Sequence, residues 1–376
     1  MKKFKNIMTA ICVITVIVSC LTMTIIRPKG KNSFQENRPL AELPKLSING
    51  LSDGSCTRNL SAYMTDHFAG RSYWLSAKSK IDLNIGESIV NNVYIGDTMQ
   101  LSLESNTDRN FDKTIELINS FNDNYSGTLY LAAVPSSSGI YTDKLPKYFT
   151  ENTEKKQIDD FYNGLNGEIR KIDAYNILKM LNDNYIYYRN DSRWTSYGAY
   201  CVYRTVIQKL GFLPIAYDKY TIEHITGNFM GNLYNRSQYK DLKADIIDIY
   251  NYSSGTEVIS CTGIDNNGNE QQRKLYYREY IGTNNMYKMY LGEDVPLIRI
   301  NTNVNNEKRL LLIKDDYANC FVPFLTQHYS VIDIVSPECI EKGLSDFADI
   351  NDYEQILFLF GIDSYGESEI FKHINE

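Results

Sequence analysis

The stretch RLLLIKDDYANCFVPFLTQHYSVIDIV, residues 309–335, is the most informative part of the sequence about the fold. Leu310–Lys314 and Val331–Val335 are short apolar runs typical of buried strands, and Ala318–Gln327 between them is predicted to be a helix. The same alternation continues as helix, strand and helix over Pro337–Ile350, Gln355–Phe360 and Glu367–Ile374. Strands that alternate with helices at this spacing indicate a parallel sheet with helices on its faces. We therefore expect an α/β fold with three layers.

An earlier apolar run is expected to join the same sheet. Thr128–Val134 is predicted to be a buried strand that ends at Pro135, so Leu129 and Leu131 should lie among the later strands. Ser136–Gly139 follows the carboxyl end of this strand, where α/β folds place ligand-binding groups. A run of serines is weak evidence for a nucleophile, and these residues suit equally a helix cap or the rim of a pocket.

Residues from about 214 to 305 have a different pattern. Apolar runs such as Ala244–Tyr250 and Lys274–Tyr277 are separated by turn-forming clusters such as Asp265–Asn269. This alternation is typical of β-hairpins. We therefore expect a β-rich insertion at about 214–305 within one α/β domain that spans residues 51–376. The many tyrosines of the insertion suit either carbohydrate contact or the packing of a sheet surface.

The amino-terminal segment predicts a transmembrane anchor. Residues 7–26 form an uncharged run that is long enough to cross the bilayer core as one helix. A cleaved signal peptide and a lipoprotein signal at Cys20 are the competing interpretations. However, no small-residue cleavage site follows the run, and the apolar residues continue beyond Cys20. We expect residues 1–6 to be a cytoplasmic tail, residues 27–50 a linker, and the domain to lie on the extracytoplasmic side of the cell membrane.

Charge and cysteine spacing exclude several classes of function. The chain has a net charge of −7 although its first 31 residues contain six basic residues and no acidic one, so the remainder is strongly acidic. An acidic domain does not suit a phosphate backbone, and we expect no nucleic-acid partner. The seven cysteines are widely spaced without a C-x-x-C pair, and no cluster has the spacing of metal ligands. We expect neither a metal nor a cofactor.

One loop and the helix after it carry the candidate site. The stretch YYRNDSRWTSYGAY, residues 187–200, passes from aromatic residues through a polar run into a helix-forming segment. Thr195 or Ser196 is expected to cap this helix. Asp191 and Arg193 therefore lie on a loop just before a helix, a position from which side chains often face a pocket. A turn closed by a salt bridge between these two residues is the alternative interpretation.

This stretch resembles the signature of the DHHW family, extracytoplasmic proteins related to the alginate O-acetyltransferase branch of the SGNH hydrolases. The family pattern is Asp-His-His-Trp-Thr followed by Gly-Ala-Tyr. The matching positions are Asp191, Trp194, Thr195, Gly198, Ala199 and Tyr200. Ser192 and Arg193 replace the two histidines, the second of which is the catalytic base of the family. Segments Ser33–Leu40, Thr65–Arg71 and Gly227–Tyr234 resemble shorter family elements.

A second block, Ile313–Phe324, resembles the family's Lys-Asp-Ser-Tyr-Ala-Asn run, in which the serine is the nucleophile. Asp316 occupies the position of that serine. The resemblance thus assigns Asp191, Arg193 and Asp316 to the catalytic positions, with Trp194, Tyr317 and Asn319 as substrate-binding residues. The base and the serine lie within hydrogen-bond reach of each other in the family geometry. Arg193 and Asp316 should therefore face each other as an ion pair, which Asp191 completes on the other side of the guanidinium.

These replacements favour a protein without acyl-transfer activity. Acyl transfer needs a nucleophilic oxygen or sulfur and a base that takes its proton. The guanidinium of Arg193 stays protonated, and an acyl group on Asp316 would form a mixed anhydride that is prone to hydrolysis. We expect a membrane-anchored, catalytically inactive protein of the polysaccharide O-acetyltransferase type that binds cell-envelope polysaccharide or assists its modification, with a membrane acyltransferase as a further candidate partner. The alternative is an active O-acetyltransferase or esterase with a rearranged site, for which Cys320 and His328 are a conceivable pair.

Overall fold

The computed structural model describes residues 2–26, 30, 32–33, 38–45, 47, 50, 52–103, 109–146, 149, 154–252 and 255–376. The chain forms two compact units. The first unit consists of Met1–Asn91 with Tyr234–Asp241, and the second of Asn92–Leu233 with Leu242–Glu376. Both segments of the candidate site belong to the second unit, so the geometry of that site is internal to one compact body.

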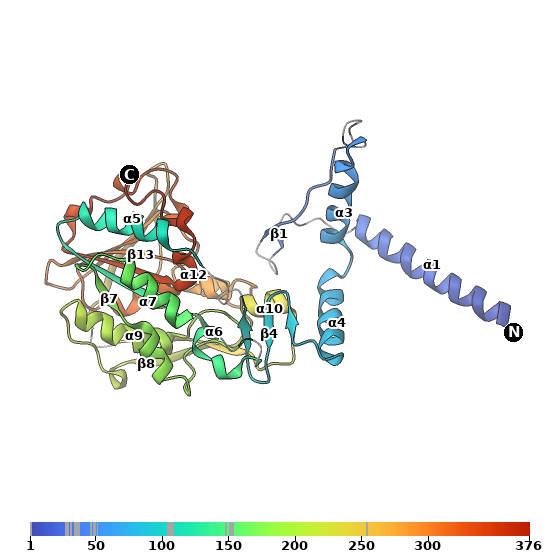
Figure 1. Ribbon diagram of the computed structural model, residues 1–376, viewed down its shortest axis with the longest axis horizontal. Helices are drawn as coiled ribbons and strands as arrows, with labels where there is room; N and C mark the ends of the chain where they lie inside the picture. The colour runs from blue at the N-terminus through green and yellow to red at the C-terminus, as the bar shows by residue number, and fades with distance from the viewer. Residues whose placement is uncertain are drawn as a thin grey trace. The chain divides into compact units, whose positions relative to one another are not determined.

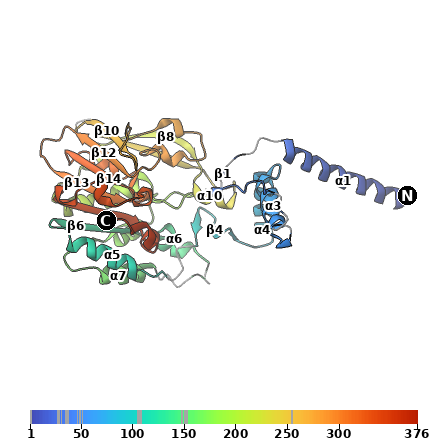
Figure 2. The ribbon, with the colours of Figure 1, turned by 90° about the horizontal axis from the view of Figure 1, so that it is seen from above.

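The core of the second unit is a large mixed sheet whose central strands are parallel (Figures 1 and 2). Among the described residues its strand order is β11 (Glu270–Gln272), β10 (Val258–Ile264), β12 (Leu297–Thr302), β14 (Val331–Val335), β13 (Arg309–Lys314), β15 (Gln355–Gly361), β6 (Thr128–Val134) and β7 (Arg170–Ile172). The five strands from β14 to β7 are parallel. Ile356 of β15 pairs with Leu311 of β13 on one side and with Leu129 of β6 on the other. The prediction that these strands are neighbours in one largely parallel sheet is confirmed.

Helices with one apolar side complete the core of this unit. The longer ones are α5 (Asp112–Asp123), α7 (Glu154–Gly164), α8 (Ala174–Met180) and α9 (Ser196–Lys209), with α5 packed against α7 and α8 against α9. Ile118 and Phe121 are buried on α5, and Val202 and Val206 on α9. Their spacing of three and four residues places each pair on one side of its helix. The class of the fold, a mixed α/β arrangement around a sheet with parallel strands, agrees with the prediction.

The predicted β-rich region divides its strands between two sheets. β8 (Thr221–Phe229) and β9 (Asp245–Asn251) pair with each other as a separate antiparallel two-stranded sheet. In contrast, β10 and β12 continue the central sheet, since β12 pairs antiparallel with β14 and β10 pairs antiparallel with β12. The region from 214 to 305 is therefore rich in strands, as expected, and part of it extends the edge of the parallel core.

Three predicted helices are wrong in length or type. Ala318–Gln327 was predicted as one helix, but the structure has a 3-10 turn η7 (Asp316–Ala318) followed by the single-turn helix α11 (Val322–Leu325). Pro323 explains the break, because it lacks an N–H to donate and its ring opposes the carbonyl four residues earlier. Pro337–Ile350 and Glu367–Ile374 contain only short turns, namely η8 (Pro337–Cys339), η9 (Leu344–Asp346), η10 (Ile350–Asp352) and η11 (Ser368–Phe371), with α12 (Ile362–Tyr365) before the last one.

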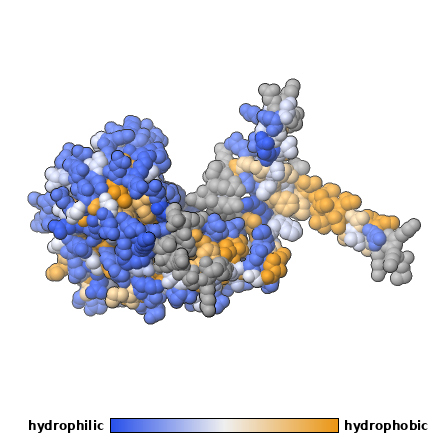
Figure 3. Space-filling view, in the orientation of Figure 1, coloured by the Kyte–Doolittle hydropathy of each residue, from blue (hydrophilic) through white to orange (hydrophobic). Residues whose placement is uncertain are grey.

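The first unit begins with helix α1 (Lys2–Ile26). Its segment Asn6–Thr24 is long and apolar enough to cross a membrane, in agreement with the run predicted at residues 7–26. Exposed side chains such as Ile7, Ile14 and Ile17 make α1 a hydrophobic rod in Figure 3. A helix that is hydrophobic all round needs an apolar surrounding, which a bilayer would supply.

Among the described residues, two further long helices belong to the first unit. They are α3 (Ser55–His67) and α4 (Arg71–Asn84), and the chain turns between them at Gly70, whose φ of +71° suits glycine. The remaining short elements among the described residues are β1 (Asn32–Ser33), β2 (Arg38–Pro39), β3 (Ile89–Val90), β4 (Val93–Ile95), β5 (Gln100–Ser102), α6 (Ser137–Ile140), η2 (Thr142–Lys144), η4 (Tyr217–Lys219), α10 (Asn232–Ser237), η5 (Arg278–Tyr280) and η6 (Met286–Met289). Much of the predicted linker 27–50, including Glu36 and Asn37 of its family-like element, lies outside the described residues.

Candidate functional site

The loop that carries Asp191 and Arg193 is fixed at both of its ends. Tyr187 and Trp194 face each other in an antiparallel bridge, which closes the loop. The hydroxyl of Thr195 then accepts a hydrogen bond from the backbone N–H of Gly198 at 3.2 Å and so caps α9, as predicted. Because both ends are tied to regular structure, the intervening polar side chains have defined positions.

Asp191 and Arg193 form a two-pronged ion pair within this loop. Nε and Nη2 of Arg193 each donate to one carboxylate oxygen of Asp191, both at 2.7 Å. The side chain of Asp191 is fully buried, and it also accepts hydrogen bonds from the backbone N–H groups of Arg193 at 3.0 Å and Asn232 at 2.9 Å. Burial raises the pKa of Asp191, but the charge and hydrogen bonds of Arg193 outweigh burial and leave this pKa below its usual value. The loop therefore holds a buried carboxylate in its ionised form.

The remaining nitrogen of the guanidinium reaches across to the turn after β13. Nη1 of Arg193 lies 3.0 Å from Oδ2 of Asp316. The two side chains differ in exposure, 14% for Arg193 and 53% for Asp316, so solvent reaches the outer carboxylate. The guanidinium also lies 3.6 Å from the ring centroid of Tyr287, a cation–π contact. The expected Asp–Arg–Asp cluster is present, with Tyr287 as a fourth member.

Asp315 shapes the turn that presents Asp316. Its carboxylate accepts hydrogen bonds from the backbone N–H of Tyr317 at 2.9 Å, the N–H of Gly361 at 2.8 Å and the hydroxyl of Ser364 at 2.7 Å. These bonds join the carboxyl ends of the neighbouring strands β13 and β15. Burial raises the pKa of Asp315 to about 7, although its hydrogen bonds act in the opposite direction. The turn is thus fixed by backbone contacts, and the next side chain, Asp316, projects outward.

The three residues predicted to bind substrate are buried. Trp194 is fully buried, and its indole N–H donates to the carbonyl oxygen of Tyr317 at 2.8 Å. The hydroxyl of Tyr317 donates to the carbonyl of Ser192 at 3.1 Å, and the amide of Asn319 donates to Asp316 at 3.3 Å. These contacts connect the loop before α9 to the turn after β13. Trp194 and Tyr317 hold the two segments of the site together, and contact of all three residues with a substrate stays a prediction.

Two residues of the cluster were missed by sequence reasoning. Tyr287, from the short turn η6, covers the guanidinium of Arg193 and donates through its hydroxyl to the carbonyl of Asp316 at 3.2 Å. Asn232 donates its backbone N–H to Asp191 and accepts from the N–H of Ser192 at 2.9 Å. The family-like segment Gly227–Tyr234 was a signal for Asn232, whereas Tyr287 is one of 30 tyrosines and had no distinguishing signal.

Cys320 and His328 do not form a pair in this structure. The sulfur of Cys320 lies 3.4 Å from the hydroxyl of Tyr287, and Nε2 of His328 lies 2.7 Å from the hydroxyl of Tyr203. Burial raises the pKa of the Cys320 thiol to about 12 and lowers the pKa of His328 to about 4. A neutral, buried thiol without an adjacent base does not have the properties of an activated nucleophile.

The serine run after β6 has a capping role. The hydroxyl of Ser136 accepts from the backbone N–H of Gly139 at 3.0 Å, at the start of α6, and donates to Glu154 at 2.7 Å. Ser136, Ser137 and Ser138 are all buried. The capping interpretation is therefore confirmed for Ser136.

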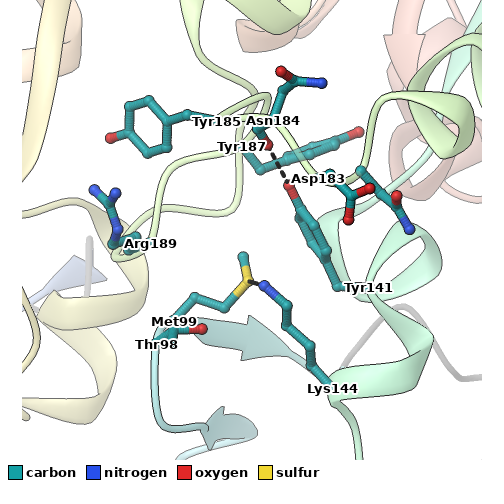
Figure 4. A pocket seen from close by; sticks show the side chains of 10 residues that line it. Thr98, Met99, Tyr141, Lys144, Asp183, Asn184, Tyr185, Tyr187 and Arg189 are labelled. Carbon is teal, nitrogen blue, oxygen red and sulfur yellow. Dashed lines mark hydrogen bonds between the residues drawn. The ribbon is translucent and has the colours of Figure 1, made fainter.

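A cavity of about 350 Å³ lies beside the segment that leads into the candidate site. Figure 4 shows Tyr185 and Arg189 on one side of it and Tyr141 and Lys144 on the other. Its lining is completed by Thr98, Met99, Asn182, Asp183, Asn184 and Tyr187. Each cation stacks on a ring, Arg189 at 4.4 Å from Tyr185 and Lys144 at 4.5 Å from Tyr141. Tyrosine rings, amides and charged groups therefore line this cavity.

Comparison with known proteins places the chain in a family. The sequence matches the family described as DHHW protein over residues 77–335. No match was found among curated proteins. A crystal structure of a DHHW family protein from Eubacterium siraeum is similar, with 21% identity, a TM-score of 0.64, and coverage of 76% of this chain and 96% of that chain.

Two structures of Bacillus cereus PatB1 are similar to a comparable extent. One has 23% identity, a TM-score of 0.63, and coverage of 75% of this chain and 99% of that chain. The other, which carries a sulfonyl adduct, has 20% identity, a TM-score of 0.63, and coverage of 75% and 98%. At these identities the likeness shows a shared fold. Because the family match extends over more than half of the sequence, the chain belongs to the DHHW protein family.

Proposed function

We propose that this DHHW protein is a membrane-anchored, extracytoplasmic protein with a three-layer SGNH-like domain that binds cell-envelope polysaccharide and does not transfer acyl groups. The ion pair of Arg193 with Asp191 and Asp316 is the observation that carries the proposal. It occupies the positions that the resemblance assigns to a catalytic base and a serine. The helix α1 supports the anchor, and a membrane acyltransferase is a candidate partner that would supply the missing chemistry.

The cluster has no group that can take the proton of a nucleophile, as acyl transfer requires. A guanidinium does not give up its proton in water. Burial alone would lower the pKa of Arg193, but the partners Asp191 and Asp316 outweigh burial and raise this pKa above its usual value. All three of its donor nitrogens already point at carboxylate oxygens. Asp316 offers a carboxylate instead of a hydroxyl. The same contacts that stabilise the site therefore occupy the groups that a reaction would use.

The cavity beside the site is the proposed glycan-binding surface. Tyrosine rings bind the C–H faces of flat ligands and still offer a hydroxyl, and amides and charged groups orient polar substituents. Lys144 and Asn184 are exposed at this cavity, whereas Tyr141 and Tyr187 are buried in its wall. A neutral or anionic sugar would therefore meet the exposed polar groups of Lys144 and Asn184 first.

The purified full-length chain is expected not to hydrolyse acetyl esters above the buffer rate and not to be labelled by a sulfonyl fluoride. The double variant Arg193→His/Asp316→Ser is expected to gain both properties, because it restores a base and a hydroxyl at 193 and 316. Each single variant supplies only half of the pair and serves as the control. Ester hydrolysis by the unchanged chain that disappears in Arg193→Ala would instead favour the active alternative. Circular dichroism checks that each variant is folded.

Envelope polysaccharide fragments are expected to bind the full-length chain, and binding should weaken about tenfold, equivalent to about 1.4 kcal/mol, in Lys144→Ala/Asn184→Ala. The physical reason is the loss of two exposed polar contacts at the cavity. Lys209→Ala removes an exposed lysine at the end of α9 and should bind as the unchanged chain does. Isothermal titration calorimetry with a panel of polysaccharide fragments measures the affinity of each variant. Equal affinity of the double variant and the control would place the glycan elsewhere, and no binding in the whole panel would contradict the proposed function.

A further inference from the structure

One side of α4 exposes large hydrophobic side chains. The exposed fractions are 57% for Trp74, 59% for Ile81 and 70% for Ile85, which follows the last turn of the helix. Trp74 and Ile81 are seven residues apart and Ile85 is four further on, so the three lie on the same side of the helix. Tyr73, 84% exposed, borders this stripe. Scattered apolar residues are normal on a protein surface, but an aligned stripe with a tryptophan indicates a contact surface.

The opposite side of α4 is occupied within its own unit. The hydroxyl of Ser79 donates to the carbonyl of Ser237, and Nζ of Lys80 lies 3.3 Å from Oδ1 of Asp241. Ser79 is buried. The segment Tyr234–Asp241 therefore contacts the polar side of α4 and leaves the side with Trp74 and Ile81 turned away from the unit.

The start of α4 is tied to the end of the apolar part of α1. The backbone N–H of Ala69 donates to the hydroxyl of Thr24 at 3.0 Å. Thr24 is the last residue of the segment that is apolar enough to cross a membrane, and Ala69 precedes Gly70 and α4 directly. If α1 crosses a bilayer, this contact places the first turn of α4 at the level where the hydrocarbon core ends.

The residues on the exposed side of α4 are of the kinds found at the boundary between the hydrocarbon core and the headgroups of a membrane. Tryptophan and tyrosine are enriched where hydrocarbon meets headgroups, because their rings are apolar and carry one polar group. Lys78 lies four residues after Trp74, on the same side of the helix, and its Nζ lies 2.8 Å from Oδ2 of Asp82, so this polar pair borders the apolar stripe. Helices of this kind lie in the plane of the interface with their apolar side among the acyl chains.

We infer that α4 lies on the outer surface of the membrane, with Trp74, Ile81 and Ile85 inserted into a phospholipid bilayer beside the proposed anchor. The inference rests on the proposed anchoring of α1 and adds a second, surface-bound contact to it. Such a contact would hold the first unit against the membrane.

The tryptophan content makes this inference directly measurable. The chain has two tryptophans, Trp74 and the fully buried Trp194. The full-length chain is reconstituted into vesicles of phosphatidylglycerol and phosphatidylcholine whose acyl chains carry bromine near the headgroup end. Bromine quenches tryptophan at short range, so the unchanged chain should lose the Trp74 part of its emission. The variant Trp74→Phe, which emits only from Trp194, should show no loss.

A second variant and a fractionation step separate the possible failures. Ile81→Asp/Ile85→Asp should abolish the quenching of Trp74 while the chain stays with the vesicles through α1; quenching that persists would overturn the inference. Unquenched Trp74 in a chain that floats with the vesicles would also overturn it and leave the anchoring intact, and cross-linking between copies at α4 would then assign this side to a second copy. A chain that does not float with the vesicles would contradict both the anchoring and the inference.

Discussion

Replacing Arg193 by alanine is expected to lower the free energy of unfolding by about 3 kcal/mol, because it leaves the buried carboxylate of Asp191 without its cation. Most of the loss comes from Asp191, which is fully buried and bound through two nitrogens of the guanidinium. The contact with Asp316 adds little, since a carboxylate that is 53% exposed is well hydrated without a partner. The lost packing on Tyr287 adds to the effect in the same direction.

Urea unfolding of the full-length chain in detergent, followed by near-UV circular dichroism, measures this loss. Arg278→Ala is the matched control, because Arg278 also pairs with a carboxylate, that of Glu223, but both side chains are largely exposed. The control should change the free energy of unfolding by less than about 1 kcal/mol. A loss in Arg193→Ala no larger than that of the control would show that Asp191 is stable without its partner, and the cluster would then have no structural role.

The charged cluster of Asp191, Arg193 and Asp316 has a structural role in holding the site together. A buried ion pair contributes little compared with an apolar replacement, but the loss of one partner is costly. The ion pair between Arg193 and Asp316 joins the loop before α9 to the turn after β13. Tyr287 closes the cluster from a third segment. The arrangement therefore supports binding by a defined surface more readily than it supports proton transfer.

The parallel part of the sheet was predictable from the sequence, because buried parallel strands are continuous apolar runs. Leu310–Lys314 and Gln355–Phe360 have this pattern, and both are strands at the expected places. The antiparallel extension was not predictable in the same way. Alternating runs indicate a hairpin, but they do not specify that β12 pairs with β14 instead of a strand of the same insertion. Pro323 lies inside the predicted helix Ala318–Gln327, and because it has no N–H to donate, only the single-turn helix α11 forms there.

The candidate site was only partly predictable. Asp191, Arg193 and Asp316 occupy positions of two recognisable segments, and the pairing of Arg193 with Asp316 follows from the geometry that those segments imply. Burial was not visible in the sequence. Trp194 looks like a ligand-binding aromatic residue, but its ring stacks on Phe321 in the core and its N–H is taken by the carbonyl of Tyr317. Which side chains face solvent depends on tertiary packing that no local pattern records.

The stability of the protein is expected to fall in mild acid because of His328. Its ring is buried against Phe212 and Tyr203, with Nε2 at 2.7 Å from the hydroxyl of Tyr203. Burial lowers the pKa of His328 to about 4, so the folded protein keeps the ring neutral while the unfolded chain, with a histidine pKa near 6.5, takes up a proton. The contribution of His328 to pH dependence is therefore absent above about pH 7 and destabilises the fold as the pH falls towards 4.

The gap between the two pKa values is equivalent to about 3 kcal/mol, of which about 2 kcal/mol should be lost between pH 7 and pH 5. Urea midpoints at the two pH values measure the loss of stability. Carboxylates that titrate in the same pH range also contribute to this loss, and comparison with His328→Gln subtracts their contribution. This variant keeps a polar partner for Tyr203 but has no imidazole that can take up a proton, so its own loss of stability on acidification should be smaller by about 2 kcal/mol.

His224→Gln is the control, at an imidazole that is 71% exposed beside Asp248, and it should leave the contribution of His328 to the acid response in place. If the unchanged chain and His328→Gln lose the same stability between pH 7 and pH 5, His328 is protonated in the folded protein, and the Tyr203 hydroxyl must then accept a hydrogen bond from the charged ring inside the core.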